Sequence, residues 1–287
     1  MSETADVIAW LGRREERVDW INANRLAAWA ATLDRADPFP QAGDQVPPGF
    51  HWTLFPPVAL QSELGRDGHP KRGGFLPPVM LPRRMWAGGT LSFHSPLCVG
   101  EAVRQISEIE SIREKQGKSG RLVFVTVRHK ISGSAGLAVD EEQEIVYREA
   151  APPGSTGAAG IEPARLGPWR REIAADGVLL FRYSALTFNG HRIHYDRHYA
   201  TGEEGYPGLV VHAPLIATLL LDLLRRNVPD QPLLRFSFRA LRPTFDISPF
   251  HVDGSPGDAA GHWRLWSTDN RGSTGMEAEG WTRPLRE

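Results

Sequence analysis

The sequence predicts an α+β protein of two related halves, in each of which a helix lies across a curved antiparallel sheet. Three observations support this fold class. Segments rich in β-branched or alternating apolar residues follow one another between residues 90 and 148, as in an antiparallel meander. Residues 214–226 form a strongly apolar helical segment that such a sheet would bury. Residues 90–97 are similar to residues 235–241, and each segment precedes a group of strands, so the 287 residues divide into about two units.

The first half is expected to contain one helix followed by a sheet. Apolar residues at three- and four-residue spacing predict a helix over 19–33. The proline- and glycine-rich residues 38–82 predict loops and short elements. The expected strands, which are separated by glycines, are residues 90–93, 102–113, 121–132 and 137–148.

The second half follows a low-complexity stretch of small residues, 150–167, which cannot support a packed core. We therefore expect an N-terminal domain at residues 1–150 and a C-terminal domain at residues 165–287. Residues 178–183 are interpreted as a strand and residues 214–226 as the buried helix. Three more strands are expected over residues 233–241, 248–253 and 262–268.

Composition excludes several classes of protein. Lys and Arg number 33 against 34 Asp and Glu, a net charge of −1, so no nucleic-acid partner is expected. The most apolar stretch, residues 208–224, is interrupted by polar residues and is shorter than the roughly 20 residues of a membrane span. The charged first 20 residues do not resemble a signal peptide. Cys98 is the only cysteine, so we expect no disulfide and a reducing, cytoplasmic location.

Polar side chains that suit acid-base chemistry are concentrated just after the apolar residues near 181. Asn189, His191, His194 and Asp196 lie within eight residues of one another. Histidine transfers protons near neutral pH, and an amide can hold the same water, so Asn189 and His194 are candidates for a catalytic pair. The alternative is an Asn-Gly hairpin turn with ordinary histidines. Metal binding is not expected, because no predicted helix places His191 and His194 together.

The start of the buried helix is a second candidate. Pro214 suits the first helical position, and the free backbone N–H groups there can stabilise negative charge on a thioester oxygen as an enolate forms. Plain capping of the helix is the alternative.

Two runs of sequence resemble the hydroxyacyl-thioester dehydratase branch of the MaoC-like hot-dog family. They are Phe-Arg-Tyr-Ser-Ala-Leu-Thr-Phe-Asn-Gly-His-Arg-Ile-His-Tyr-Asp at residues 181–196 and Tyr-Pro-Gly-Leu-Val-Val-His-Ala-Pro-Leu at residues 206–215. Pro-Arg-Arg-Met-Trp-Ala-Gly-Gly at residues 82–89 is also similar. The resemblance covers nearly the whole chain. It implies a tandem (double) hot-dog fold with the catalytic motif in the C-terminal half only.

The same resemblance implies an enzyme that adds water reversibly to an α,β-unsaturated acyl-CoA thioester, without a metal or redox cofactor. The family motif runs Asp-x-Asn-Pro-Ile-His, and its His falls on His194. Its Asp, Asn and Pro positions hold Asn189, His191 and Arg192. Because an amide cannot exchange a proton as a carboxylate does, His194 is expected to be the base and Asn189 to hold the water.

The resemblance also suggests substrate contacts. It places the oxyanion-binding amide near Ala213, next to His212, where family members often have Gly. A guanidinium at Arg192 could pair with a second carboxylate on the acyl group, or it could simply form an ion pair with Asp196.

The group that protonates the α-carbon is left open at this point. His194 could return the proton that it takes from water. Tyr183, Tyr195 and Asp196 are the other candidates, and their spacing selects none of them.

Two other functions fit the same residues: a dehydratase acting on acyl chains held by a carrier protein, and a non-catalytic thioester-binding protein. A homodimer is also compatible, although a fused pair of hot dogs already contains the interface that single-domain relatives form by dimerising.

Overall fold

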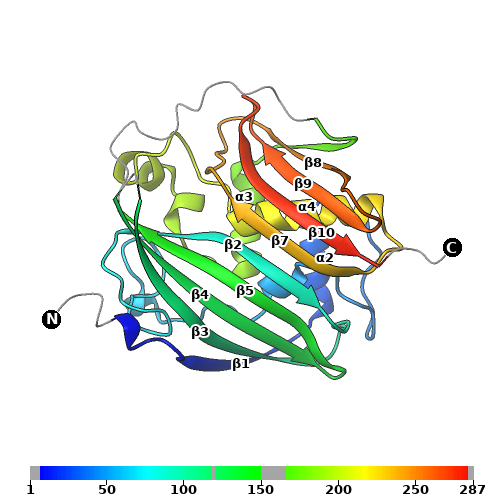
Figure 1. Ribbon diagram of the computed structural model, residues 1–287, viewed down its shortest axis with the longest axis horizontal. Helices are drawn as coiled ribbons and strands as arrows, with labels where there is room; N and C mark the ends of the chain where they lie inside the picture. The colour runs from blue at the N-terminus through cyan, green and yellow to red at the C-terminus, as the bar shows by residue number, and fades with distance from the viewer. Residues whose placement is uncertain (1–6, 118–119, 150–165, 284–287) are drawn as a thin grey trace.

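The computed structural model describes residues 7–117, 120–149 and 166–283. A single ten-stranded antiparallel sheet runs through both halves in the order β1-β3-β4-β5-β2-β7-β10-β9-β8-β6 (Figure 1). The first five strands in this order belong to the N-terminal half and the other five to the C-terminal half. The halves join where β2 pairs with β7. The strands are β1 Arg14–Trp20, β2 Arg83–Phe93, β3 Ala102–Gly117, β4 Gly120–Gly133, β5 Gly136–Arg148, β6 Trp169–Ile173, β7 Leu233–Ala240, β8 Phe250–Pro256, β9 His262–Thr268 and β10 Thr274–Thr282.

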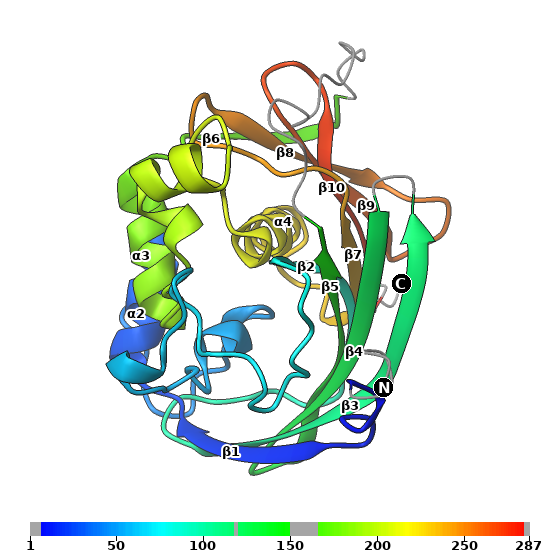
Figure 2. The ribbon, with the colours of Figure 1, turned by 90° about the vertical axis from the view of Figure 1, so that its left-hand side faces the viewer.

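Each half runs through its elements in the same order. An outer strand comes first (β1 or β6), then helices, an inner strand (β2 or β7) and three strands that pair in sequence. Figure 2 shows the sheet curving around α4, with α2 and α3 on the side away from the strands. The helices are α2 Ala23–Thr32, α3 Gly177–Thr187 and α4 Ala213–Asn227. The order of strands and helices thus repeats in the two halves, in agreement with the α+β class that the sequence predicts.

Helix α4 is the centre of the C-terminal half. Every residue from Leu215 to Leu224 is buried, because the strands cover one side of the helix and the preceding loops and helices cover the rest. A helix that is apolar all round is stable only in such a position.

One charged residue lies inside this apolar helix. The side chain of Asp222 has no exposed surface and accepts hydrogen bonds from Arg35 (3.1 Å), Arg171 (3.0 Å) and Arg226 (2.7 Å). Arg35 follows α2 and Arg171 lies on β6, so this cluster ties the central helix to both halves of the chain.

The N-terminal half departs from the expected pattern in one element. Where the C-terminal half has α4, it has only the short 3₁₀ turns η1 Phe50–Thr53 and η2 Gln61–Glu63, within the proline-rich segment. Proline removes hydrogen-bond donors and fixes φ, so a long helix cannot form there. A central helix is therefore present in the C-terminal half alone.

The strand expected over residues 178–183 is wrong, because these residues belong to α3. The carboxylate of Asp176 accepts a hydrogen bond from the backbone of Leu179 (2.9 Å) and so caps the helix. Leu180, Tyr183 and Ser184 face inward at helical spacing. Six apolar residues are too few for periodicity to separate a strand from a helix.

The remaining differences between the expected elements and the structure concern strands near the ends of each half and the start of the first helix. Strands β1, β6 and β10 are not anticipated by the sequence, and the first helix begins at Ala23 with Asn22 as its N-cap rather than at residue 19. The four strands β2–β5 and helix α4 are confirmed. The expected domain boundary falls on residues 150–165, outside the described residues.

Candidate active site

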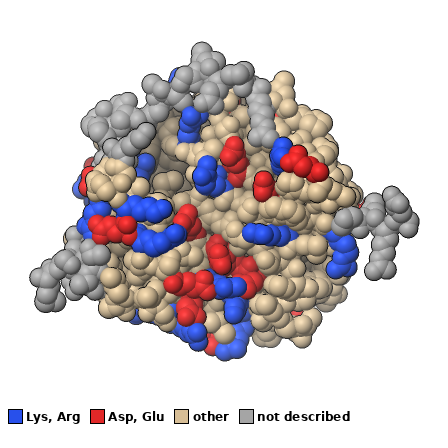
Figure 3. All heavy atoms as spheres, in the orientation of Figure 1, with Lys and Arg blue, Asp and Glu red and all other residues tan. Residues whose placement is uncertain are grey.

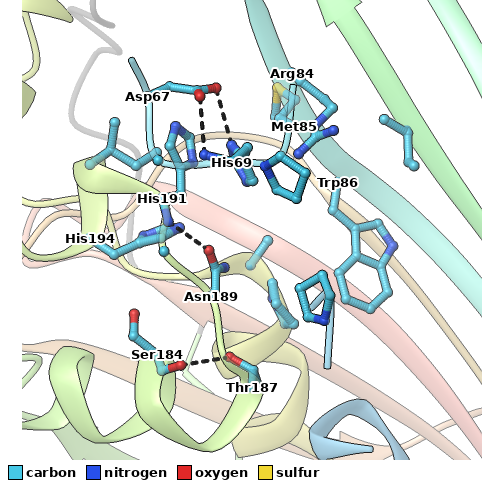
Figure 4. Close-up of a pocket in the computed structure, with 18 of the residues that line it drawn as sticks. Asp67, His69, Arg84, Met85, Trp86, Ser184, Thr187, Asn189, His191 and His194 are labelled. Carbon is cyan, nitrogen blue, oxygen red and sulfur yellow. Dashed lines mark hydrogen bonds and ion pairs between the residues drawn. The ribbon is translucent and has the colours of Figure 1, made fainter. Parts of the chain in front are cut away.

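A cavity of about 1120 Å³ lies between the two halves. Its wall combines the loop after α3, the start of α4, the loop at residues 64–77 and the inner faces of β2 and β5. Asn189 and His194 both lie on this wall (Figure 4). The N-terminal half, which lacks the motif, thus supplies much of the surface that a substrate would touch.

His194 ends a single 3₁₀ turn, η3 Arg192–His194, and is 7% exposed. Its Nδ1 donates a hydrogen bond to the carbonyl oxygen of Val210 at 2.7 Å, a contact that requires the proton on Nδ1 and leaves a lone pair on Nε2. Burial lowers the pKa of His194 to about 4, although the bond to Val210 opposes this. His194 is therefore a neutral base at neutral pH.

His212 supports His194 from behind. The two imidazole rings are stacked, with centroids 3.6 Å apart. His212 is fully buried, and its Nε2 lies 2.9 Å from the hydroxyl of Ser184 on α3. It does not line the cavity, although a substrate contact was expected there. The structure thus places His212 where it can hold His194 in position, not where it can touch the substrate.

Asn189 lies just after α3, which ends at Phe188 in a left-handed conformation (φ 51°). Its side-chain Oδ1 accepts a hydrogen bond from the backbone N–H of His191 (3.0 Å). This bond fixes the orientation of the amide and leaves its NH₂ group to donate to a water in the cavity.

Ala213 begins α4 and lines the cavity. No side chain caps this helix, and Pro214 contributes no N–H. The free N–H groups of the first turn are therefore available to an oxygen that becomes negatively charged.

Arg192 has partners of its own within the protein. Its Nη2 and Nε donate to Asp196 (2.7 and 3.0 Å), and its Nη1 donates to the carbonyl of Arg66 (3.1 Å). The guanidinium also stacks over the ring of Tyr199 at 4.2 Å. The structure thus shows the ion pair with Asp196, the simpler of the two roles considered from the sequence.

The candidate acids other than His194 are also committed to other contacts. Tyr195 is half exposed and donates to the carbonyl of Gly190 (3.0 Å). Burial raises the pKa of Tyr183, whose hydroxyl lies 3.3 Å from that of Thr218. Asp196 accepts the hydrogen bonds of Arg192 described above.

The sequence analysis missed two residues at this site, Asp67 and His69. Both lie in the proline-rich segment of the N-terminal half, where Asp67 Oδ2 is 3.2 Å from His69 Nδ1. The His69 ring is 4.1 Å from that of His191, which in turn is 5.3 Å from that of His194. An Asp-Gly-His sequence in the proline- and glycine-rich segment was the available signal, and it carries no spacing that links it to residues about 120 positions away.

Glycine makes this meeting of loops possible. Gly68 has φ +86°, and a Cβ at that position would lie 2.0 Å from the carbonyl oxygen of Gly190. The backbones also bond directly, because the N–H of Arg192 donates to the carbonyl of Asp67 (2.9 Å). A side chain at residue 68 would therefore push the two loops apart.

The ligand atoms of Asp67, His69 and His191 lie within 4.8 Å of one another, a grouping that a metal ion could use. Two features oppose a cation there. His69 Nδ1 already bonds Asp67, and the positive charges of Arg84 and Arg72 face the same ring. The expectation of an enzyme without a metal therefore stays our prediction.

The surface agrees with the balanced composition. Basic and acidic side chains are interspersed on the face shown in Figure 3. Ion pairs of the sheet strands include Arg128 with Asp140 (2.8 Å) and Arg113 with Glu144 (3.1 Å). Among the described residues, no helix is long and apolar enough to span a membrane.

A double hot-dog fold with a buried neutral histidine, a neighbouring amide and an uncapped helix start defines a hydratase or dehydratase of acyl thioesters. The chain belongs to the hydroxyacyl-thioester dehydratase type 2 family, whose model matches residues 49–246. It is 48% identical over 257 residues to the mesaconyl-C(4)-CoA hydratase of Chloroflexus aurantiacus, covering 88% of this chain and 90% of that protein.

Solved structures confirm the fold. HtdX from Mycobacterium tuberculosis superposes with a TM-score of 0.67 at 19% identity, covering 95% of this chain and 99% of that one. A second protein from the same organism, described as having a double hot-dog fold, gives a TM-score of 0.59 at 12% identity, with 95% and 96% covered.

Proposed function

We propose that this protein is a hydratase that adds water reversibly to an α,β-unsaturated acyl-CoA thioester, with mesaconyl-C4-CoA as substrate and citramalyl-CoA as product. The observation that carries the reaction type is the state of His194, a buried base with a free Nε2 that lines the same cavity as Asn189. The identity to a mesaconyl-C(4)-CoA hydratase supports the substrate.

In the hydration direction, a water held by the amide of Asn189 gives a proton to Nε2 of His194 while its oxygen attacks the β-carbon. The electron pair of the double bond moves to the thioester oxygen as an enolate forms. The free N–H groups near Ala213 stabilise this negative charge, and they cost no reorganisation because the helix already fixes them.

The protonated His194 then returns its proton to the α-carbon, and the enolate collapses to the saturated thioester. One water is added and no net proton is consumed. This single-group route gives syn addition, and it fits the site because Tyr183, Tyr195 and Asp196 are all engaged elsewhere. The reaction needs no redox cofactor, and CoA enters only as part of the substrate.

Loss of the enoyl-thioester absorbance with mesaconyl-C4-CoA and crotonyl-CoA tests the proposal. Wild-type protein should turn over, and His194→Ala should lower kcat by roughly 10³-fold, within the range of general acid-base catalysis. His198→Ala is the matched control, because His198 is exposed and close in sequence. A folded wild type that is inactive on both substrates would contradict the proposal and favour carrier-bound substrates or a binding role.

Two expectations about the protein's context are proposals as well. We expect it to act in the cytoplasm and to form a homodimer. Gel filtration with light scattering tests the dimer directly, and elution at the mass of a single chain would contradict it.

A further inference from the structure

We infer that Arg84, together with the hydroxyl of Tyr147, binds the free carboxylate of a dicarboxylic acyl-CoA substrate. This inference rests on the proposed function and deepens it, because it names the residues that would select a carboxylated acyl group. It also replaces Arg192, the residue to which the sequence assigned this role.

The chemistry of the substrate sets where such a site must lie. In mesaconyl-C4-CoA the free carboxylate is attached to the β-carbon, the same carbon that the water attacks. A group that binds the carboxylate must therefore lie beside the catalytic histidine and not at the far end of an acyl tunnel.

Arg84 meets this requirement. It lies on β2 directly opposite Tyr147 of β5, and opposed residues of an antiparallel pair project from the same face of the sheet. Both residues line the cavity. Figure 4 shows Arg84 on the same side of the cavity as His69 and Asp67.

The charge of Arg84 is felt at the histidines next to the base. Burial lowers the pKa of His69 and of His191, and the charge of Arg84 lowers both further. His191 in turn lies against His194, with ring centroids 5.3 Å apart. Arg84 therefore lies near the histidines that adjoin the base, on the wall of the same cavity as His194.

The neighbouring arginines of the cavity wall are neutralised or saturated. Arg83 pairs with the carboxylate and carbonyl of Glu204. Arg72 donates to three backbone carbonyls, those of Val79, Leu81 and Pro82. The charge of Arg192 is paired with Asp196.

Arg84 differs from these three. Among the described residues, no carboxylate lies within ion-pair distance of its guanidinium. Arg148 also lines the cavity without an ion pair among the described residues, but it lies opposite Arg83 in the sheet, whereas Arg84 lies opposite Tyr147.

Tyr147 supplies the second, independent observation. The residue is fully buried, and no hydrogen bond of standard geometry reaches its hydroxyl among the described atoms. Burial raises the pKa of this hydroxyl, and the neighbouring guanidinium of Arg84 opposes that shift, so the two groups lie close together. Burying a hydroxyl without a full hydrogen bond is unfavourable. A carboxylate could satisfy it by accepting its hydrogen bond while also receiving two parallel bonds from the guanidinium of Arg84.

The one fully buried carboxylate on the cavity wall does not compete for Arg84. Glu141 accepts from Trp52 Nε1 (3.0 Å) and lies 3.3 Å from His51 Nε2, so its charge is already compensated. A substrate carboxylate would thus be the partner that Arg84 lacks.

The test compares kcat/KM of wild type, Arg84→Met and Arg192→Met on mesaconyl-C4-CoA and on crotonyl-CoA, which lacks the carboxylate. Arg84→Met should lose roughly 100-fold or more on mesaconyl-C4-CoA, as expected when one partner of a buried charge pair is removed, and little on crotonyl-CoA. Arg192→Met should affect both substrates alike. Tyr147→Phe should lose less than Arg84→Met, again on the carboxylated substrate only.

Equal losses on both substrates for an Arg84→Met protein that retains measurable activity, or a selective loss for Arg192→Met instead, would overturn the inference. If Arg84→Met is inactive on both, Arg84→Lys decides, because lysine keeps the charge and loses only the bidentate geometry. A loss confined to mesaconyl-C4-CoA supports Arg84, and equal losses contradict it. Wild type that hydrates crotonyl-CoA but not mesaconyl-C4-CoA would instead refute the proposed substrate, and the inference with it.

Discussion

The two halves share a strand order but divide the work of the site. The C-terminal half carries the buried helix α4, and His194 lies in the loop that precedes it. The N-terminal half has only the short 3₁₀ turns η1 and η2 at the corresponding place among its described residues. A half without a central helix leaves space inside its curved sheet, and the cavity lies between this half and the catalytic loop. The C-terminal half thus carries the proposed catalytic residues, and the N-terminal half forms much of the cavity wall.

The N-terminal half also contributes side chains to the candidate active site. Its loop brings Asp67 and His69 against His191, and its strands present Arg84 and Tyr147 to the same cavity. A half that lacks the catalytic motif is therefore not an inert support, and the following experiments separate its contribution from that of the C-terminal half.

The largest expected effect concerns the central helix that only one half has. Asp222→Ala leaves Arg35, Arg171 and Arg226 without their shared carboxylate, and breaking a buried ion pair in this way should lower the free energy of unfolding by about 3–5 kcal/mol. Denaturant unfolding measures this. Asp258→Ala, which removes an exposed ion pair with Arg264, is the control and should change stability little. Equal effects of the two changes would show that the Asp222 cluster does not hold the halves together.

A smaller effect is expected where the N-terminal loop meets the catalytic loop. Gly68→Ala places a Cβ against the carbonyl of Gly190 and should lower kcat/KM by roughly tenfold by shifting Asp67 and His69. Gly43→Ala is the matched control, because Gly43 has a similar φ (+90°) but open space around its Cβ.

Both glycine changes should cost a similar backbone strain of about 1 kcal/mol, and Gly68→Ala adds the clash with Gly190, so the loss of activity and any further loss of stability are specific to Gly68. Full activity of a folded Gly68→Ala protein would mean that the contact between the loops serves stability alone.

The smallest expected effect is a shift in the pH dependence of activity, which depends on His194 in the C-terminal half. The folded pKa of His194, about 4, is below its ordinary value of 6.5, so the active neutral form persists as the pH falls through 6.5. The acid limb of kcat/KM should therefore lie near pH 4 and not near 6.5.

The same shift has a consequence for stability. Below about pH 6.5 the unfolded chain binds a proton at His194 and the folded chain does not. The free energy of unfolding therefore has its full value above pH 6.5 and decreases as the pH falls toward 4. Initial rates and unfolding midpoints across this range measure both effects. An acid limb near pH 6.5 would show that His194 is solvated before substrate binds.

Local patterns in the sequence predicted part of this structure and failed in identifiable places. Strands β3 to β5 alternate over long runs, and α4 is apolar over more than four turns, so their types follow from periodicity alone. The type of helix α3 does not follow from periodicity, because the inward orientation of Leu180, Tyr183 and Ser184 depends on the elements that pack against the helix. The candidate site was predicted to the extent that one continuous segment holds Asn189 and His194.

The sequence by itself determined the α+β class, the antiparallel meander, the buried helix and the two residues proposed for the chemistry, because each depends on residues close together in the chain. Only the tertiary structure decided which arginine faces the cavity unpaired, which histidine stands behind the base, and that Asp67 and His69 approach His191. Asp67 and His69 approach His191 from about 120 residues away, and no local spacing encodes that contact; it depends on two glycines that let the loops touch. The place of Arg84 follows from the pairing of β2 with β5 and β7. His194 and His212 are closer in the sequence, but their stacking depends on how the loop folds back onto the start of α4.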